Sequence, residues 1–321
     1  MKLEHPYDNL TDGLWLRGNL HAHTTRSDGR RPPQAVINDY AARGYDFLMF
    51  SDHDVWTSPD DLAVLDPCRM VLLPGNEITA GGPHILHVNA GQKIAPHPRR
   101  QEVLMEISAD PGSFSVVCHP NWLFRCSDTA PTRPPMHPHV IWTQLSEWVG
   151  YAGVEIYNGA TARLDGSPYA TDVWDLLLST GRRVWGFAND DSHRTEGDVP
   201  RPGKVDHTPL MRSDMALGWN VVYARRDVAS IVEALRAGRF YASTGVQITG
   251  IFVEGNRVRI ETSNGCRLIA LRETGRRFAQ VDGAALEVDI PPDARYVRFE
   301  AWGVGEQRAW TQPFLVRNNQ R

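Results

Sequence analysis

The sequence predicts an α/β fold in which strands alternate with helices, followed by a small antiparallel β domain. Three observations support this prediction. Short apolar runs recur through the first two thirds of the chain, and each stops at or carries a histidine or carboxylate. Segments with helical apolar spacing separate these runs, which is typical of parallel strands joined by crossover helices. From about Gly245, apolar residues instead alternate with a period of two.

The apolar runs of the first part are predicted to be buried strands that present polar side chains at their carboxyl ends. In chain order they are Leu14–Leu16 before His21, His23 and Asp28; Leu48–Ser51 before Asp52, His53 and Asp54; Val71–Asn76 before Glu77; Ile85–Asn89 around His87; Phe114–Cys118 before His119; and Val184–Ala188 before Asp190, Asp191 and His193. In barrels of parallel strands and helices, the active site lies at this end of the strands. The sequence therefore predicts one shared polar site.

Capping residues mark the helices between these strands. One helix is predicted from Pro32-Pro33 to Arg43-Gly44, where glycine suits the left-handed turn that ends a helix. A second begins at Ser58-Pro59, with serine as N-cap and proline in the first turn. Further helices are predicted over residues 139–149, 168–181 and 227–237.

The residues after Gly245 are predicted to form a small antiparallel β-sandwich. The runs 246–253 and 257–261 alternate, and Asn264-Gly265 is a hairpin-type turn signal. Further short strands are predicted over 268–271, 286–290, 296–301 and 314–316. We therefore divide the chain into residues 1–244 and an all-β domain of residues 245–321. The second part contains no histidine, so it is expected to contribute no imidazole to the site.

Two long irregular stretches, 125–139 and 194–214, follow polar strand ends and are predicted to be lids or specificity loops. The histidines that they contain are interpreted as loop residues rather than metal ligands. These are His137, His139 and His207.

Composition narrows the function classes. The net charge of −4 argues against a nucleic-acid surface, which usually has a basic excess. We expect no membrane span and no signal peptide, because the N-terminus has no apolar core and no run approaches about 20 apolar residues. The four cysteines are widely spaced and form no zinc-type pairs, so we expect reduced thiols in a cytoplasmic protein. Cys118 is expected to be a small buried hydrophobic residue rather than a nucleophile. A homo-oligomer remains open.

The pair His21-x-His23 is the most informative local pattern. If Leu14–Leu16 leads into a strand, both imidazoles point to the same side, because side chains alternate between faces. Two neutral imidazoles on one side are suitable metal ligands. A set of imidazoles and carboxylates without thiolate fits divalent ions of Zn, Mn or Fe.

The series of motifs resembles the PHP (polymerase and histidinol phosphatase) family of metal-dependent hydrolases, which are related to the amidohydrolases. The resemblance spans residues 15–193 in the family's order. Its motifs are His21-x-His23-Thr24 with Ser27-Asp28-Gly29, Asp52-His53, Glu77, His119-Pro120 and Asp191-x-His193. The resemblance implies a distorted seven-stranded βα (TIM-like) barrel that holds two or three divalent metal ions.

Further segments resemble local signatures of the carbaryl-hydrolase-like branch of this family. They are His87–Ala90, His119–Trp122, Glu155–Gly159, Gly238–Gly245 and Ala309–Phe314. This branch resemblance narrows the fold more than the substrate.

The family resemblance also implies the metal ligands. His21, His23, Glu77 and Asp191 would hold the first metal; Glu77 would bridge to a second that His87 and His119 complete; Asp28, His53 and His193 would hold a third. His84 precedes His87 by three residues and would face the opposite side of a regular strand, so we assign His87 as the ligand. Some relatives have a histidine near position 28, so the aspartate there weakens the third site.

The predicted function is hydrolysis of a phosphoester, a small phosphomonoester or cyclic phosphodiester, through a hydroxide that bridges the metals. We assign catalytic roles to Glu77, Asp191 and His193. Anionic substrate is expected to contact Arg125, Arg194 and Asn121, whereas Arg30-Arg31 is interpreted as surface unless it faces the site.

The alternative is hydrolysis of a carboxyl ester or carbamate, which needs two metals and an apolar pocket. The aromatic residues that could line such a pocket are Trp122, Phe124, Trp142 and Trp148. A metal-binding module without catalysis is the third reading. Asp52, Asp54, Asn76 and Asp190 are expected to orient imidazoles by hydrogen bonds. Glu155 and Asn158 either orient water or substrate, or close the barrel.

Overall fold

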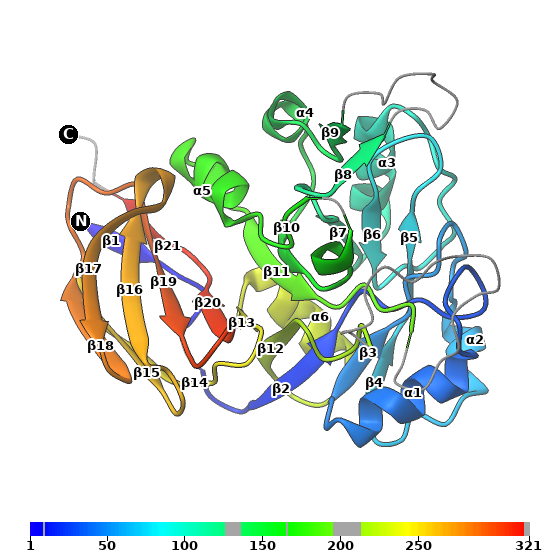
Figure 1. Cartoon of the computed structure of the whole chain (residues 1–321), viewed down its shortest axis with the longest axis horizontal. Helices are drawn as coiled ribbons and strands as arrows, with labels where there is room; N and C mark the ends of the chain where they lie inside the picture. Colours follow the sequence, from blue (N-terminus) through cyan, green and yellow to red (C-terminus); the bar gives the residue numbers. More distant parts are fainter. Residues whose placement is uncertain (9, 126–135, 165, 195–212, 318–321) are drawn as a thin grey trace.

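The structure is a computed structural model that describes the chain except residues 9, 126–135, 165, 195–212 and 318–321. It confirms a mixed α/β fold (Figure 1). Two large sheets, two small sheets and a few helices make up the described part. No helix within it is long and apolar enough to cross a membrane.

The largest sheet joins strands from both ends of the chain. Its strands are β1 Lys2–Glu4, β2 Leu14–Asn19, β3 Phe47–Met49, β4 Val71–Leu73, β12 Trp219–Ala224, β13 Phe240–Ser243, β16 Arg267–Arg272, β17 Arg276–Asp282, β19 Tyr296–Trp302, β20 Arg308–Thr311 and β21 Phe314–Arg317. The order is β1-β21-β19-β20-β13-β12-β2-β3-β4, and β16 lies between β19 and β17. The pairs β2–β3 and β3–β4 are parallel, and the other pairs are antiparallel.

The second large sheet supplies most of the site. Its strands are β5 Gly75–Ile78, β6 Ile85–Val88, β7 Phe114–Val117, β10 Gly153–Asn158 and β11 Trp185–Asn189, in the order β11-β10-β7-β6-β5. Every residue of these strands is buried, so neither face of the sheet is left to solvent.

Strand β6 differs from the expectation of parallel strands joined by helices. It runs antiparallel to both β5 and β7, whereas β10 is parallel to β7 and β11. The segment between β5 and β6 covers only residues 79–84. A parallel crossover needs about a dozen residues or more, so this connection has to be a hairpin.

Two single β-bridges connect the two large sheets beside the polar strand ends. Ala22, just after β2, bridges to Ser192, just after β11. His53, just after β3, bridges to Glu77 of β5. The carboxyl ends of β2, β3 and β11 therefore meet the edge strand β5 at one place.

Six α-helices and two 3₁₀ turns lie in the described part. They are α1 Pro33–Ala42, α2 Pro59–Ala63, α3 Arg100–Ala109, α4 Trp142–Glu147, α5 Thr171–Ser179, α6 Val228–Ala237, η1 Ala160–Arg163 and η2 Glu273–Gly275. The predicted caps are present: Ser58 forms a capping box with Asp61, and α6 ends at Gly238 with φ 79°. Helix α3 was not predicted.

The C-terminal strands form a sandwich with a shared apolar core. The small sheet is β14 Ile248–Glu254, β15 Arg257–Thr262 and β18 Ala285–Asp289, in the order β14-β15-β18. Its Val258 and Ile260 are buried with Leu268 and Phe299 of the large sheet. The predicted period of two is confirmed in β15, whose residues alternate between exposed and buried along most of its length. Because β13 pairs with β20, the large sheet continues across the predicted domain boundary.

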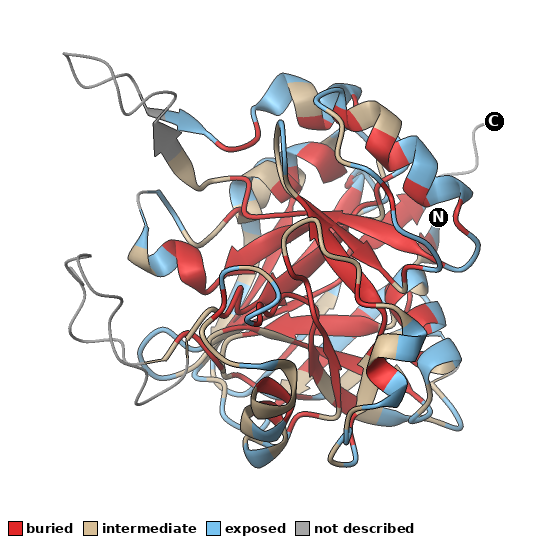
Figure 2. Ribbon diagram, turned by 90° about the vertical axis from the view of Figure 1, so that its right-hand side faces the viewer, coloured by how far each residue is buried: buried red, intermediate tan, exposed pale blue. Residues whose placement is uncertain are grey.

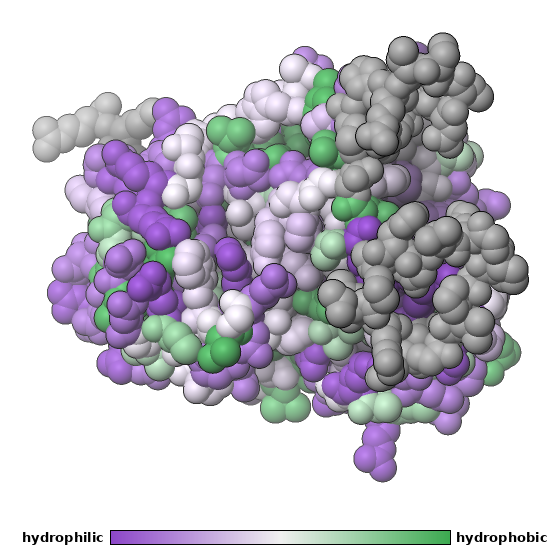
Figure 3. All heavy atoms as spheres, viewed as in Figure 1, coloured by the Kyte–Doolittle hydropathy of each residue, from purple (hydrophilic) through white to green (hydrophobic). Residues whose placement is uncertain are grey.

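The distribution of buried residues fits this layout. Buried residues concentrate in the strands, and exposed residues lie mainly on helices and loops (Figure 2). On the face shown in Figure 3, hydrophobic residues are scattered among hydrophilic ones.

The last sheet is the antiparallel pair of β8 Leu123–Arg125 and β9 Met136–Pro138.

Candidate metal centre

Glu77 lies at the middle of a cluster of imidazoles. The edge strand β5 carries it, and its side chain is fully buried. Its oxygens lie 3.4 Å from His21 Nε2, 3.5 Å from His23 Nε2, 2.8 Å from His53 Nδ1, 2.9 Å from His84 Nδ1 and 3.4 Å from His119 Nε2. The cluster brings together residues that follow β2, β3 and β7, as the strand-end argument requires. His84, which precedes β6, joins them because β6 runs antiparallel to β5 and β7.

Asp191 adds a second carboxylate on the side of His21 and His23. Its Oδ1 lies 3.2 Å from His21 Nε2 and 3.1 Å from His23 Nε2. Ligands about 2.1 Å from one ion are about 3.0–3.4 Å apart, depending on whether the geometry is octahedral or tetrahedral. The spacing of His21, His23 and Asp191 therefore fits one divalent ion, and Glu77 lies 3.4–3.5 Å from both histidines.

Asp28, His53 and His193 form a third group at the rim. Asp28 Oδ1 lies 3.3 Å from His193 Nε2 and 3.6 Å from His53 Nε2. The Asp28 side chain is 46% exposed, whereas Glu77 is buried. This group can also hold a cation, but solvent reaches it more readily than the groups around Glu77.

Unpaired polar atoms support the presence of metal at the buried groups. His21 Nε2, His23 Nε2 and Glu77 Oε2 are inaccessible, and although opposite polar atoms lie 2.8–3.2 Å from them, none of these contacts within the described residues has the geometry of a hydrogen bond. A buried polar atom without a partner costs about 1–3 kcal/mol, so native proteins rarely leave several together. Divalent metal ions would satisfy all three atoms.

The electrostatics of the centre favour ionised carboxylates. Burial alone would raise the pKa of Glu77 and of Asp191, but the adjacent imidazoles, His21 foremost, hold both pKa values well below their ordinary range. Burial also lowers the pKa of His23, to about 4. The pKa of His193 is raised to about 9 against the effect of burial, because Asp28 accepts a hydrogen bond from it and Asp191 is close.

The structure corrects one predicted ligand. His87 points away from the cluster, and its Nε2 contacts Asp110 Oδ2 at 3.0 Å. In the β5–β6 pair, His87 is opposite Asn76, while Glu77 is opposite Leu86. Directly opposed residues share a face, and His84 is two residues from Leu86, so His84 lies on the face of Glu77. The imidazole that joins the cluster from this segment is therefore His84.

Glu155 is the residue that orients an imidazole. It is buried in β10, and its Oε1 lies 2.7 Å from His21 Nδ1, which fixes Nε2 as the nitrogen facing Glu77 and Asp191. Its Oε2 accepts hydrogen bonds from the backbone N–H of His119 and from Asn158 Nδ2, both at 2.8 Å. Asn158 also donates to Asp191 at 3.2 Å. The sequence leaves two roles open for Glu155 and Asn158, orienting other groups at the site or closing the barrel, and these contacts favour the first.

The acidic residues next to the ligands accept hydrogen bonds from backbone N–H groups and threonine hydroxyls, whereas we expected them to accept from imidazoles. Asp52 accepts hydrogen bonds from Thr24, and Asp54 from Thr79, in the loops after His23 and Glu77. Asp190 caps the backbone N–H groups of residues 216–218. Asn76 Oδ1 has no hydrogen-bond partner within the described part.

Backbone strain occurs at the ligand-bearing turns. Asp54, His119 and Asp191 have φ values of 53°, 26° and 53°. Such conformations cost about 1–3 kcal/mol in non-glycine residues and cluster at functional sites. Here they turn the chain sharply at the ends of β3, β7 and β11.

The predicted substrate contacts are placed as follows. Arg194 lines a small pocket with Arg31, His23 and His193, and its Nε lies 3.8 Å from Asp214 Oδ2. Asn121 instead donates to the Tyr169 carbonyl and to Asp172, away from the ligands. The side chains of Arg125 and Phe124 lie outside the described residues, as does His207. Arg31 faces the site, which the sequence could not decide.

The aromatic residues divide between site and core. The Trp122 ring lies 5.3 Å from the His119 ring and 5.9 Å from the His84 ring, measured between centroids. Trp148 is buried in the core, and Trp142 is exposed. Only Trp122 among these three contacts the candidate ligands within the described part.

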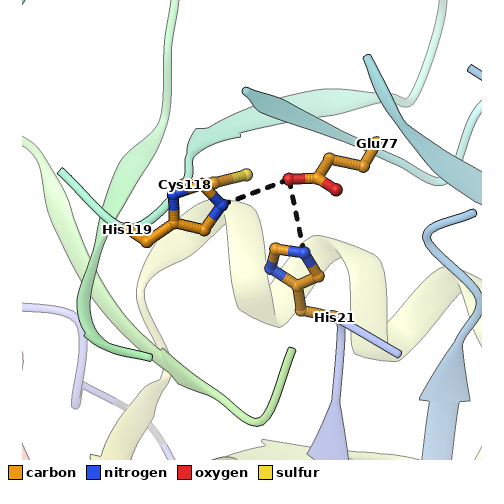
Figure 4. Close-up of side chains that lie close together, drawn as sticks. All are labelled: His21, Glu77, Cys118 and His119. Carbon is orange, nitrogen blue, oxygen red and sulfur yellow. Dashed lines mark ion pairs between the residues drawn. The ribbon is translucent and has the colours of Figure 1, made fainter. Parts of the chain in front are cut away.

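Cys118 lies close to His21, Glu77 and His119 (Figure 4). The thiol is fully buried, and burial raises its pKa well above the ordinary value. Its Sγ donates to the Val116 carbonyl at 3.8 Å. Burial and the nearby carboxylates therefore keep the Cys118 thiol protonated in the absence of metal.

Comparison of the sequence with family models and with curated proteins found no match. Among solved structures, the chain is similar to a two-domain protein from Bacteroides vulgatus that contains a predicted PHP-like metal-dependent phosphoesterase. The identity is 16%, the coverage 100% of this chain and 91% of that one, and the TM-score 0.49. An amidohydrolase from Chromobacterium violaceum with bound sulfate is 16% identical over 57% of this chain and 90% of its own, with a TM-score of 0.38. These distant likenesses do not assign a reaction or substrate to this chain.

Proposed function

We propose that this protein is a metal-dependent hydrolase of a small phosphoester, either a phosphomonoester or a cyclic phosphodiester. The observation that supports an anionic substrate is that Arg31 and Arg194 both border a water-sized pocket next to His23 and His193. Guanidinium groups bind phosphate oxygens with fixed geometry. Asp39 and Asp214 lie 3.6 Å and 3.8 Å from these two groups, so each arginine that borders the pocket also forms an ion pair with a carboxylate.

The residues would hold up to three divalent ions. The first would be held by His21, His23, Glu77 and Asp191, the second by Glu77, His84 and His119, and the third by Asp28, His53 and His193. When bound, such ions lower the pKa of coordinated water towards neutrality and neutralise the charge that develops on the substrate.

The chain itself supplies position and charge around this centre. Glu77 is enclosed by imidazoles, so it acts by holding ligands together rather than by exchanging protons with solvent. Glu155 keeps His21 in the tautomer that presents Nε2. Asp28 and His193 lie at the exposed rim, and they are placed to exchange a proton with solvent or with a leaving group when they do not hold the third ion.

We also propose that the strands around the centre form a distorted barrel. Paired strands follow one another in the order β2-β3-β4 and then β5-β6-β7-β10-β11. The bridge between Ala22 and Ser192 connects the end of β11 back to the end of β2 and so closes the ring. Pro74 alone separates β4 from β5, so these two count as one bent strand of a seven-membered ring. The carbaryl-hydrolase-like branch remains a prediction.

One contact supports the alternative of a carboxyl ester or carbamate substrate. Trp122 packs beside His119 and His84, so the second metal position has an apolar wall on one side. The two arginines lie on the opposite, His193, side of the centre.

A substrate panel separates the two proposals. The metal-loaded protein is assayed with p-nitrophenyl phosphate, bis-p-nitrophenyl phosphate and p-nitrophenyl acetate, before and after chelation. Turnover of a phosphate compound that chelation removes supports the phosphoesterase. Turnover of the acetate alone supports the ester or carbamate hydrolase, and no turnover by a protein that binds no metal refutes both.

A further inference from the structure

A third imidazole lies beside the two histidines proposed for the second metal. His139 is only 7% exposed, although the sequence places it after a long irregular stretch. The ring nitrogens of His84, His119 and His139 lie within 4.8 Å of one another. From the sequence, His139 is expected to be a loop residue, because no strand or motif points to it.

The separations of the three rings fit a shared ion. Their centroids are 4.5 Å apart for His84–His139, 4.7 Å for His119–His139 and 5.1 Å for His84–His119. Imidazoles bound to one ion at about 2.0–2.1 Å, with angles between about 90° and 110°, have centroids roughly 4.5–5.2 Å apart. All three separations lie in this interval.

The backbone holds His139 in this place. Its N–H donates to the Trp122 carbonyl at 2.7 Å, and the N–H of Val140 donates to the Pro120 carbonyl at 3.3 Å. The Trp122 N–H donates in turn to the His119 carbonyl at 3.1 Å. His139 is therefore fixed to the turn that carries His119. His137, two residues earlier, is exposed.

We propose that His139 is a ligand of the second metal, together with Glu77, His84 and His119. The inference rests on the proposed function, because it adds a ligand to that centre. Three imidazoles and one carboxylate favour zinc or iron over magnesium or manganese, which prefer oxygen donors. With three imidazoles against two in the rim group, the second position would then be the more selective of the two for zinc or iron.

The test is the affinity of the metal-free protein for Co²⁺, followed by visible absorption and by competition with a chelator. His139→Ala is compared with His137→Ala, its exposed neighbour, and with His84→Ala. Loss of a group that only supports a ligand weakens metal binding about 10–100-fold. We expect His139→Ala to weaken one Co²⁺ equivalent at least about 100-fold and to change its absorption, while His137→Ala matches the parent protein.

Two further results keep the inference separate from the proposed function. If His84→Ala loses the same equivalent but His139→Ala stays within about threefold of the parent, His139 is not a ligand and the proposed centre stands. If the parent protein binds no Co²⁺, both are refuted. Should His139→Ala unfold, His139→Gly with added imidazole replaces it: recovery of the parent absorption supports ligation, and a folded variant that does not recover contradicts it.

Discussion

Replacing Glu155 by glutamine should weaken metal binding without any change to a proposed ligand. The carboxylate accepts four contacts: His21 Nδ1 at 2.7 Å, Asn189 Nδ2 at 2.9 Å, and the His119 N–H and Asn158 Nδ2 at 2.8 Å. Burial would raise its pKa, but the charge and hydrogen bond of His21 outweigh this and lower the pKa, so Glu155 is ionised. Each Glu155 oxygen accepts from two of these donors, but glutamine has only one side-chain oxygen. One of the two pairs of donors would therefore face the NH₂ group of glutamine, which is itself a donor.

The expected magnitude follows from these contacts. Loss of the support behind a metal-bound histidine weakens affinity about 10–100-fold, or about 1.4–2.7 kcal/mol. The assay is competition between Glu155→Gln and a chelator for Zn²⁺, with urea unfolding to show that the variant is folded. Glu106→Gln, at an exposed position of α3, is the matched control. A folded Glu155→Gln within about threefold of the parent would refute the positioning role.

Three other predictions concern substrate charge, stability and pH. Arg31→Ala should raise KM for p-nitrophenyl phosphate about tenfold or more and leave any turnover of the acetate unchanged; an equal effect on both would contradict phosphate binding there. Arg298→Met should destabilise the fold by about 3–5 kcal/mol in urea unfolding, because Asp175 and Glu300 would remain as buried charges without Arg298, which now donates to them at 2.6 Å and 2.8 Å. Burial would raise the pKa of Glu300, but Arg298 lowers it below 4.5. The stabilising effect of the ionised Glu300 carboxylate is therefore complete above about pH 4.5 and is lost as the pH falls through the lowered pKa of Glu300. The difference in free energy of unfolding between the parent protein and Glu300→Gln should accordingly shrink in acid.

Much of the centre was predictable because strand ends leave a local signal. An apolar run that stops at a histidine or carboxylate is visible in sequence, and this signal located His21, His23, His53, Glu77 and the Asp191–His193 pair. His84 was missed because the choice between it and His87 depends on pairing register. The register follows from the hairpin between β5 and β6, and a shift of one residue exchanges the two faces.

The residues that support the centre left weaker signals. Glu155 lies inside a strand, so nothing in its neighbours shows that it reaches both His21 and His119. Arg100 opens the unpredicted helix α3, and its guanidinium donates to the Pro83 and Thr79 carbonyls at 2.6 Å, fixing the turn before His84. His139 and Arg31 reach the site through the path of their loops, which local sequence does not specify.

The metal content of the parent protein and of Glu77→Gln tests the central claim most directly. Both are equilibrated with Zn²⁺, separated from free metal, checked for folding and measured by elemental analysis. Because Glu77 is shared by two of the proposed positions, we predict two or three ions per parent chain and at most one in the folded variant. No bound metal in the parent, or equal content in both proteins, would contradict a metal centre built around Glu77.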